Sequence, residues 1–137
     1  MSKLSAFLHP VTAAGEKEVL ISGRFLDEKG KPVPFKVRAI TQEEADRLVR
    51  RSTIVRMKNG QRVEEFDRLG YNRRLIVAGT VEPDFSSAEL CEAYGVADPM
   101  LVPGRMLLSG EYGKLLQEIL DVSGFDSGAD VEGEAKN

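Results

Sequence analysis

The chain has 137 residues, of which 42% are hydrophobic and 30% are charged, and its net charge is −3. These values describe a soluble globular protein of one domain, and no apolar run approaches the roughly 18 residues that would cross a membrane. The single cysteine and the single histidine exclude an internal disulfide and most metal or catalytic-triad sites, because those sites need several convergent ligands or a positioned base.

The N-terminal segment lacks the long apolar stretch of a signal peptide. We expect this segment to be irregular, with His9 before Pro10 as a solvated or locally hydrogen-bonded side chain. The absence of a targeting or spanning segment favours a cytoplasmic protein.

Two segments of alternating apolar and polar side chains, residues 17–26 and 33–40, come next. This period of two is typical of β-strands, and the connecting DEKGKP is suited to a turn, so the segments predict an antiparallel hairpin. Thr41 and Glu44 then match a capping box, which predicts that the second strand runs directly into a helix at about 42–51.

A second, more polar hairpin is predicted at residues 53–66. Asn59 and Gly60 separate two short β-prone runs, and this dipeptide is the strongest short-range signal for a two-residue hairpin turn. A two-stranded ribbon is only marginally stable alone, so we expect it either to pack on the first hairpin or to stay mobile. The following run, residues 65–81, carries apolar side chains at helical spacing and predicts a helix.

The next helix is predicted at residues 87–94. Ser86 and Glu89 match a second capping box, and Gly95 suits the left-handed residue that ends a helix. On this helix we expect Cys91 to be a small buried hydrophobe rather than a reactive thiolate.

The C-terminal part contains an apolar loop, a long helix and a tail. Residues 97–110, with two prolines and two glycines, predict a loop with a single turn. Ser109 is expected to cap a final helix that ends at Gly124. The apolar stripe of this helix consists of Tyr112, Leu115, Leu116, Ile119 and Leu120. Residues 126–137 hold too few hydrophobic side chains to offset their ordering entropy, so we expect a disordered acidic tail.

Together these elements predict an α+β fold. An N-terminal antiparallel β-hairpin layer and the short hairpin precede a small group of α-helices, and we expect residues 1–125 to form a single domain. The loop at 97–110 is unusually apolar, and methionine adapts to different partners, so we place the candidate partner-binding surface there. Its candidate residues, which could equally cover the core beside the last helix, are Met100, Leu101, Val102, Met106 and Leu107.

No catalytic or cofactor motif occurs in the sequence. GEYGK at 110–114 lacks the earlier glycine and the hydroxyl residue of a phosphate-binding loop. Glu64, Glu65 and Asp67 are expected to form a salt-bridged surface, because adjacent acids on a strand point to opposite faces and arginines surround them. We therefore expect no cofactor, no metal ion and no enzymatic activity.

Charge is distributed unevenly along the chain. Residues 47–74 carry 9 basic and 3 acidic side chains, whereas residues 75–137 carry 3 and 12. Such a gradient can orient neighbouring copies or steer a charged partner, or it can be two solvated faces of a monomer. The basic stretch 47–62 offers an alternative function as a small nucleic-acid-binding regulator. It contains no aromatic side chain for base stacking, however, and the acidic second half would repel a polyanion.

The order of several segments resembles a known family. They are FLHPVTAAGEKEVLISGRFLDEKGKPVPFKVRAIT, QEEADRLVRRST, NRRLIVAGTVEPDFSSAELCEAYGV and MLLSGEYGKLLQEILDVSGF, over roughly residues 7–125. In this order and spacing they resemble the XkdN-like tail assembly chaperones of contractile-tailed phages and defective prophages. These segments are packing and capping patterns rather than catalytic signatures.

This resemblance implies a small, non-enzymatic α+β chaperone that acts in the cytoplasm of the bacterial host and is absent from the finished particle. Such chaperones are thought to coat the long tape-measure protein, to prevent its aggregation and to yield to tail tube subunits as the tube polymerises. The implied partners are therefore the tape-measure protein and the tail tube protein, and we also expect the chain to be able to self-associate.

Overall fold

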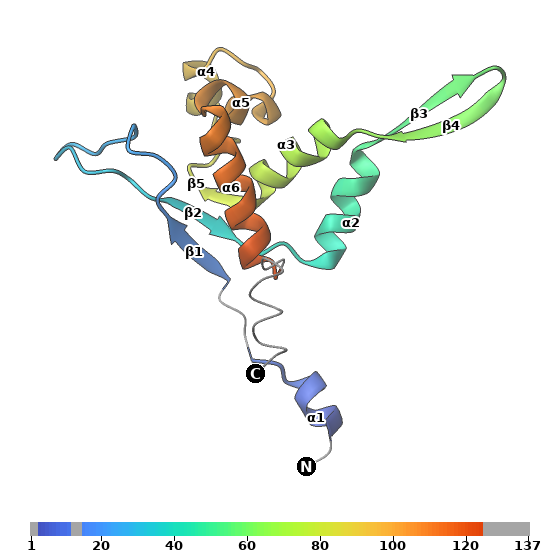
Figure 1. Ribbon diagram of the computed structural model, residues 1–137, viewed down its shortest axis with the longest axis horizontal. Helices are drawn as coiled ribbons and strands as arrows, with labels where there is room; N and C mark the ends of the chain where they lie inside the picture. The colour runs from blue at the N-terminus through green and yellow to red at the C-terminus, as the bar shows by residue number, and fades with distance from the viewer. Residues whose placement is uncertain (1–2, 12–14, 125–137) are drawn as a thin grey trace.

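The computed structural model describes residues 3–11 and 15–124, and it confirms an α+β fold (Figure 1). Its central sheet has three antiparallel strands in the order β1-β2-β5. The strands are β1 (Glu16–Val19), β2 (Phe35–Arg38) and β5 (Thr80–Glu82). β1 and β2 form the predicted first hairpin.

The strands of this first hairpin are shorter than predicted. The Oγ of Ser22 accepts a hydrogen bond from the backbone N–H of Arg24 at 3.0 Å, and such local bonding competes with strand extension. Residues 20–34 therefore form a long loop, which one isolated β-bridge closes near its tip. In Figure 1 this loop extends from the sheet on the side opposite to the second hairpin.

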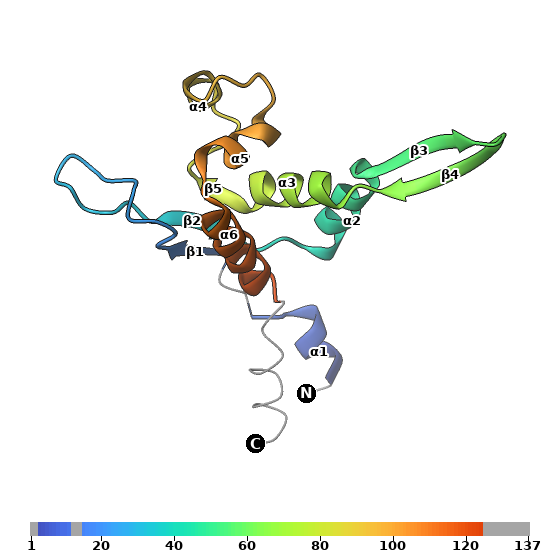
Figure 2. The same ribbon diagram turned by 45° about the horizontal axis from the view of Figure 1, so that its top comes forward.

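The three longer helices are α2 (Gln42–Arg51), α3 (Arg68–Gly79) and α6 (Ser109–Val122). α3 contacts β5, and α2 packs against α3. The predicted capping box starts α2, where the Oγ1 of Thr41 accepts from the N–H of Glu44 at 3.2 Å. α6 contacts β1, β2 and α3, so it links the sheet to the helical part (Figure 2). The buried hydrophobic core consists of Val19, Ile21, Phe35, Val37, Ile40, Leu48, Leu75, Ile76, Phe85, Cys91, Val102, Met106, Leu107, Leu115 and Ile119.

The predicted helix at 65–81 is a shorter helix between two strands. Asp67 follows the preceding strand and caps α3, with its Oδ1 accepting from the N–H of Gly70 at 3.0 Å. Thr80 begins β5, which the sequence did not predict because its apolar residues continue the helical spacing of α3. The edge of β2 supplies the hydrogen bonds that turn this short segment into a strand.

Two predicted helix caps are wrong by one residue. Ser87, rather than Ser86, caps α4 (Ala88–Ala93), because its Oγ accepts from the N–H of Leu90 at 3.4 Å. The N–H of Ser86 instead donates to the Oδ1 of Asp84 at 2.9 Å. The predicted end of this helix is confirmed, since the glycine that follows it adopts a positive φ.

At the start of α6, Ser109 is the first helical residue rather than the cap. The N–H of Leu108 donates to the Oε1 of Glu111 at 2.8 Å, so a carboxylate of the first turn satisfies the donor ahead of the helix. The helix ends as predicted at Gly124, whose φ is 99°.

The predicted loop at 97–110 is mostly helical. It forms the 3₁₀ turn η1 (Pro99–Leu101) and the helix α5 (Val102–Met106). Proline is compatible with the first turn of a helix, where its missing N–H would have no partner. The Oδ1 of Asp98 accepts from the N–H of Met100 at 3.0 Å and so starts the turn.

The N-terminal segment, which we expected to be irregular, contains the short helix α1 (Lys3–Leu8). Leu4, Phe7 and Leu8 lie at i, i+3 and i+4 on this helix and are all exposed. In the described part of the chain, no helix is long and apolar enough to span a membrane. The predicted acidic tail, residues 126–137, lies outside the described residues.

The second predicted hairpin is confirmed and projects from the body (Figure 1). β3 (Thr53–Lys58) and β4 (Gln61–Phe66) pair with each other in a separate two-stranded sheet, so this hairpin does not extend the first one. Asn59 and Gly60 adopt φ values of 53° and 77°, as a two-residue hairpin turn requires. We call residues 53–66 the arm.

Candidate partner-binding groove

An open groove of about 410 Å³ lies between α3, η1, α5 and α6. We call it the α3–α5 groove. The residues that line it are Leu69, Asn72, Arg73, Met100, Leu101, Gly104, Arg105 and Tyr112. Leu69 and Arg73 share one face of α3 because they are four residues apart, while η1 and α5 supply the opposite wall.

The lining of the α3–α5 groove leaves apolar side chains in water. Leu69 is 68% exposed and Leu101 is 41% exposed, whereas Met100 and Tyr112 are partly buried. Burial of apolar surface is worth roughly 25 cal/mol per Å², so a partner that covers these side chains would gain free energy. Contiguous apolar surface with a polar border is typical of binding sites.

Two exposed arginines give the groove a positive charge. Within the described residues, neither Arg73 nor Arg105 forms an ion pair with a carboxylate. Nη1 of Arg105 donates to the carbonyl oxygen of Tyr94 at 3.3 Å. Burial raises the pKa of Tyr112, and the positive charge of Arg73 acts in the opposite direction. The groove is therefore apolar and cationic.

The structure divides the five predicted partner-binding residues into two groups. Met100 and Leu101 line the groove. Val102, Met106 and Leu107 belong to the hydrophobic core, with exposed fractions of 0%, 9% and 8%. For these three residues the structure shows the alternative interpretation, in which they cover the core beside the last helix. Partner binding at the first two stays a prediction.

The sequence did not identify Leu69, Arg73 or Arg105 as part of this site. The spacing of Leu69 and Arg73 indicates a shared helix face, but it does not indicate whether another element covers that face. The answer depends on where η1 and α5 pack, and the two prolines there predicted a loop instead. The i, i+4 spacing is the one sequence signal that could have led to the α3 wall.

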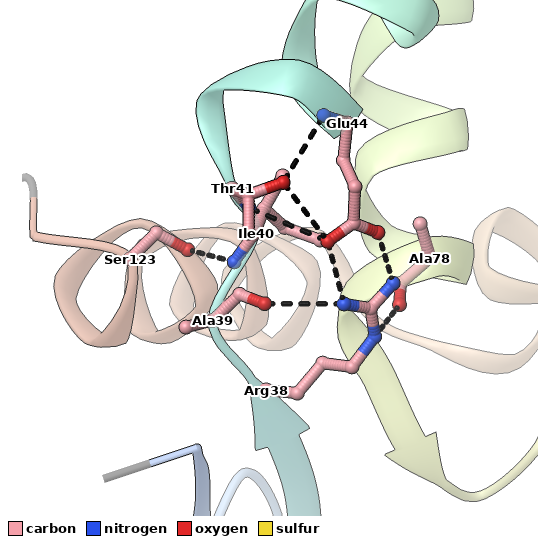
Figure 3. Close-up of polar contacts among 7 residues, drawn as sticks. All are labelled: Arg38, Ala39, Ile40, Thr41, Glu44, Ala78 and Ser123. Carbon is pink, nitrogen blue, oxygen red and sulfur yellow. Dashed lines mark hydrogen bonds and ion pairs between the residues drawn. The ribbon is translucent and has the colours of Figure 1, made fainter. Parts of the chain in front are cut away.

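A partly buried ion pair fixes the start of α2 (Figure 3). Nη2 of Arg38 lies 2.6 Å from Oε2 of Glu44, while Nε donates to the carbonyl oxygen of Ala78 at 2.9 Å. The same guanidinium donates to the carbonyl oxygen of Ala39 at 3.1 Å. This arginine holds the pKa of Glu44 at about 2, well below its usual value of 4.5.

A second bond secures the same junction from α6 (Figure 3). The Oγ of Ser123 accepts from the N–H of Ile40 at 2.9 Å and donates to the carbonyl oxygen of Ile119 at 2.6 Å. β2, α2, α3 and α6 therefore meet at one polar junction. Because α2 leads directly into β3, this junction sets the direction in which the arm leaves the body.

The arm has an apolar face. Side chains alternate between the two faces of a strand, so Val55, Met57 and Phe66 point to the same side. They are 50%, 69% and 46% exposed. This face is a second exposed apolar surface, separate from the groove residues.

The other face of the arm is ion-paired. Glu65 on that face lies 3.4 Å from Arg56 and 3.7 Å from Lys58. Glu64 and Arg62 are also paired, at 3.7 Å, but they lie on the same face as Val55 and Met57. The predicted salt-bridged surface is thus confirmed for both glutamates, whereas the aspartate that follows them caps α3. These pairs also neutralise part of the positive charge of the 47–62 stretch.

The family model of the phage XkdN-like tail assembly chaperone protein matches residues 4–136. The chain belongs to this family. Among curated relatives, this XkdN-like chaperone is 39% identical to the phage-like element PBSX protein XkdN of Bacillus subtilis (strain 168). It is 41% identical to the protein YqbN of the same strain. Both matches extend over 138 residues and cover 98% of this chain and 93% of the relative.

A solved structure supports the fold of this XkdN-like chaperone. The crystal structure of the protein YqbN matches it with a TM-score of 0.74 and 36% sequence identity. The match covers 92% of this chain and 99% of that chain. The family resemblance and the fold class inferred from the sequence are both confirmed.

The reactive side chains of this XkdN-like chaperone are dispersed. Cys91 is buried, with its Sγ 3.6 Å from the carbonyl oxygen of Phe85, as expected for a small hydrophobe. His9 is exposed beside α1. Across residues 3–11 and 15–124, no group of three His, Cys, Asp or Glu residues could hold a metal ion. The family indicates a role in tail assembly.

Proposed function

We propose that this tail assembly chaperone acts without catalysis, by binding the tape-measure protein of its phage element. Family membership supports the assembly role. The observation that carries the proposal is the α3–α5 groove, where exposed apolar side chains lie beside two arginines that have no carboxylate partner in the described part of the chain. Such a surface suits a partner that is bound for a time and then released.

Release is part of the proposed role, because tail tube subunits have to replace the chaperone as the tube polymerises. Small interfaces are typical of transient complexes, and an open groove buries limited area. Methionine at position 100 adds an adaptable contact. We propose the cytoplasm of the bacterial host as the place of action and the tail tube protein as a second partner, with the chaperone absent from the finished particle.

Co-expression tests this function. The tape-measure protein of the same phage element is produced with this chain and, as a control, with an unrelated soluble protein of similar size. We expect more soluble tape-measure protein with this chain, a complex recovered by affinity capture, and no chaperone detected by mass spectrometry in purified particles. Unchanged solubility without a recovered complex would contradict the proposal.

Self-association is a further part of the proposal, and the arm supports it. The apolar face of the arm is exposed, and the arm belongs to a segment with 9 basic and 3 acidic residues, whereas residues 75–137 have the opposite balance. Opposite charges on two parts of one chain favour head-to-tail contacts between copies. Met57→Asp should shift the sedimentation of the chain toward monomer. A wild-type chain that stays monomeric at high concentration would contradict self-association.

The nucleic-acid alternative has less structural support. Four basic residues of the 47–62 stretch lie near carboxylates: Arg47 by Glu43 at 3.5 Å, and three on the arm as described above. Paired arginines and lysines release fewer counterions on binding a polyanion. We expect no retention on heparin at physiological salt. Strong retention that weakens steeply with salt would favour the alternative.

A further inference from the structure

The α3–α5 groove has the chemistry of a receptor for one kind of structural element. We propose that it binds an amphipathic helix of the tape-measure protein, with an apolar ridge between the two walls and carboxylates that face Arg73 and Arg105. This inference rests on the proposed function and deepens it, because it states which part of the partner the chaperone recognises and by what contacts.

The walls of the groove indicate a helix rather than an extended strand. The elements that line it are α3, η1, α5 and α6, so no strand edge is available there to pair with the backbone of a bound segment. Recognition must therefore come from side chains. A helix satisfies its own backbone groups and can insert an i, i+3, i+4, i+7 ridge into such a groove.

The charges of the groove select a helix with acidic flanks. Arg73 stands on the α3 wall and Arg105 on the α5 wall, so a ridge that lies between them would have one arginine on each side. Within residues 3–11 and 15–124 both arginines lack a carboxylate partner. Arginine pairs with carboxylates in a bidentate geometry, and complementary charge fixes the register of a complex.

Two segments of this chain fit the groove less well. α1 has an exposed apolar stripe, but its neighbours are Lys3 and His9, and the helix has no acidic residue in its first turn. The tail at 126–137 has four acidic residues but only Val131 as a large apolar side chain. The first would bring the wrong charge, and the second cannot form an apolar ridge.

Two peptide probes test the proposal directly. Both are cross-linked helices of about 20 residues, a length at which a helix is stable enough to present a ridge. Both carry the same leucine ridge, flanked by glutamates in one peptide and by lysines in the other. We expect the full chain to bind the glutamate peptide at least about tenfold more tightly, because two attractive pairs become two repulsive ones. Equal binding of both peptides would overturn the proposal.

Gly104 allows the groove to be filled without disturbing the fold. A Cβ at this position would meet no atom within 4 Å, so Gly104→Leu adds its side chain to open space. We expect this variant to bind the glutamate peptide at least about tenfold more weakly. The matched control is Gly113→Leu, which adds the same side chain to open space on α6 outside the groove. Equal affinity in Gly104→Leu and the wild type would overturn the proposal.

A charge-reversal pair gives a second test. The double variant Arg73→Glu with Arg105→Glu should exchange the preference, so that the lysine peptide binds more tightly than the glutamate peptide. The control, Lys31→Glu with Lys114→Glu, changes the net charge equally at exposed positions outside the groove and should keep the wild-type preference. An unchanged preference in the arginine variant would overturn the proposal.

The other occupants give distinct results. If deletion of residues 126–137 strengthens peptide binding tenfold or more, the tail occupies the groove, and unchanged binding supports a partner helix. If Gly104→Leu converts an oligomer to a monomer, a second copy occupies the groove and the proposal fails. In co-expression, a complex that forms equally well with Gly104→Leu would refute binding in the α3–α5 groove. The proposed function would remain intact. No complex with the wild type would refute the proposed function instead.

Discussion

The side chain of Arg38 donates hydrogen bonds to three residues in different segments of the chain. Its guanidinium binds the carboxylate of Glu44 and the carbonyl oxygens of Ala39 and Ala78 (Figure 3). The planar fork of an arginine permits such a set of bonds, whereas a lysine ammonium would not span it. The side chains of the pair are 33% and 24% exposed, so solvent weakens their interaction but does not remove it.

The depressed pKa of Glu44 gives a pH-dependent contribution to stability. Its folded-state pKa is about 2 and its usual value is 4.5, so the contribution is complete above pH 4.5 and is lost as the pH falls toward 2. After allowance for solvent screening, we expect Glu44→Gln to lower the free energy of unfolding by about 1 kcal/mol at neutral pH. The difference from wild type should vanish near pH 2 in urea unfolding measured across this range.

A matched control for this prediction is Glu43→Gln, whose carboxylate is 87% exposed and lies 3.5 Å from Arg47. We expect this change to alter stability very little at any pH. A Glu44→Gln deficit that stays constant between neutral pH and pH 2 would show that the charge of the carboxylate does not stabilise the junction.

Among the secondary-structure elements, the close crossing of α3 and α6 depends on the glycine at position 79, which has no Cβ. A Cβ at Gly79 would lie 2.6 Å from Cγ2 and 2.9 Å from Cδ1 of Ile119, which is fully buried. Glycine therefore permits the close approach of the two helices beside the sheet. Gly79 is also the last residue of α3, so the same position joins the helix to β5.

Gly79→Ala should destabilise the protein by about 1–3 kcal/mol, because the added methyl overpacks the core. Ile119→Ala alone should cost about 2–5 kcal/mol through the cavity that it leaves. In the Ile119→Ala background the clashing atoms are gone, so Gly79→Ala should then cost almost nothing. Chemical unfolding of the four proteins gives this coupling, and purely additive effects would contradict the close crossing. Gly113→Ala, in open space on α6, should be neutral or stabilising.

Elements with a complete local signal were predicted well from the sequence. The Thr41 capping box fixed the start of α2, and Asn59 with Gly60 fixed the turn of the arm, because each signal acts within a few residues. β5 and α5 were missed because tertiary contacts decide them. β5 exists only as a partner of β2, and the two prolines near α5 stand where a helix can begin.

The candidate site was predictable only in part for the same reason. Met100 and Leu101 were predicted to bind a partner because they are apolar and lie in a segment that the sequence predicts as a loop. Leu69 and Arg73 come from a helix about 30 residues earlier, and the sequence does not show that η1 and α5 pack beside them. A groove formed by four elements becomes visible only when those elements are assembled.

Considered over the molecule, the α3–α5 groove and the apolar face of the arm belong to different parts of the structure. The arm projects on one side of the body and the long loop after β1 on the other (Figure 2), while the groove lies among the helices between them. We expect these surfaces to act separately, with the groove for the partner and the arm for other copies. Family membership indicates the role in assembly, and the separate roles of the two surfaces are our proposal.

Site-specific photocrosslinking in cells that co-express the tape-measure protein tests the central claim most directly. A photoreactive side chain replaces Leu101 in the groove or, as a control of similar exposure, Leu26 in the long loop, where the two leucines are 41% and 55% exposed. We predict a crosslink to the tape-measure protein from position 101 and little or none from position 26. A crosslink from position 26 alone, or equal crosslinks from both positions, would contradict binding in the α3–α5 groove.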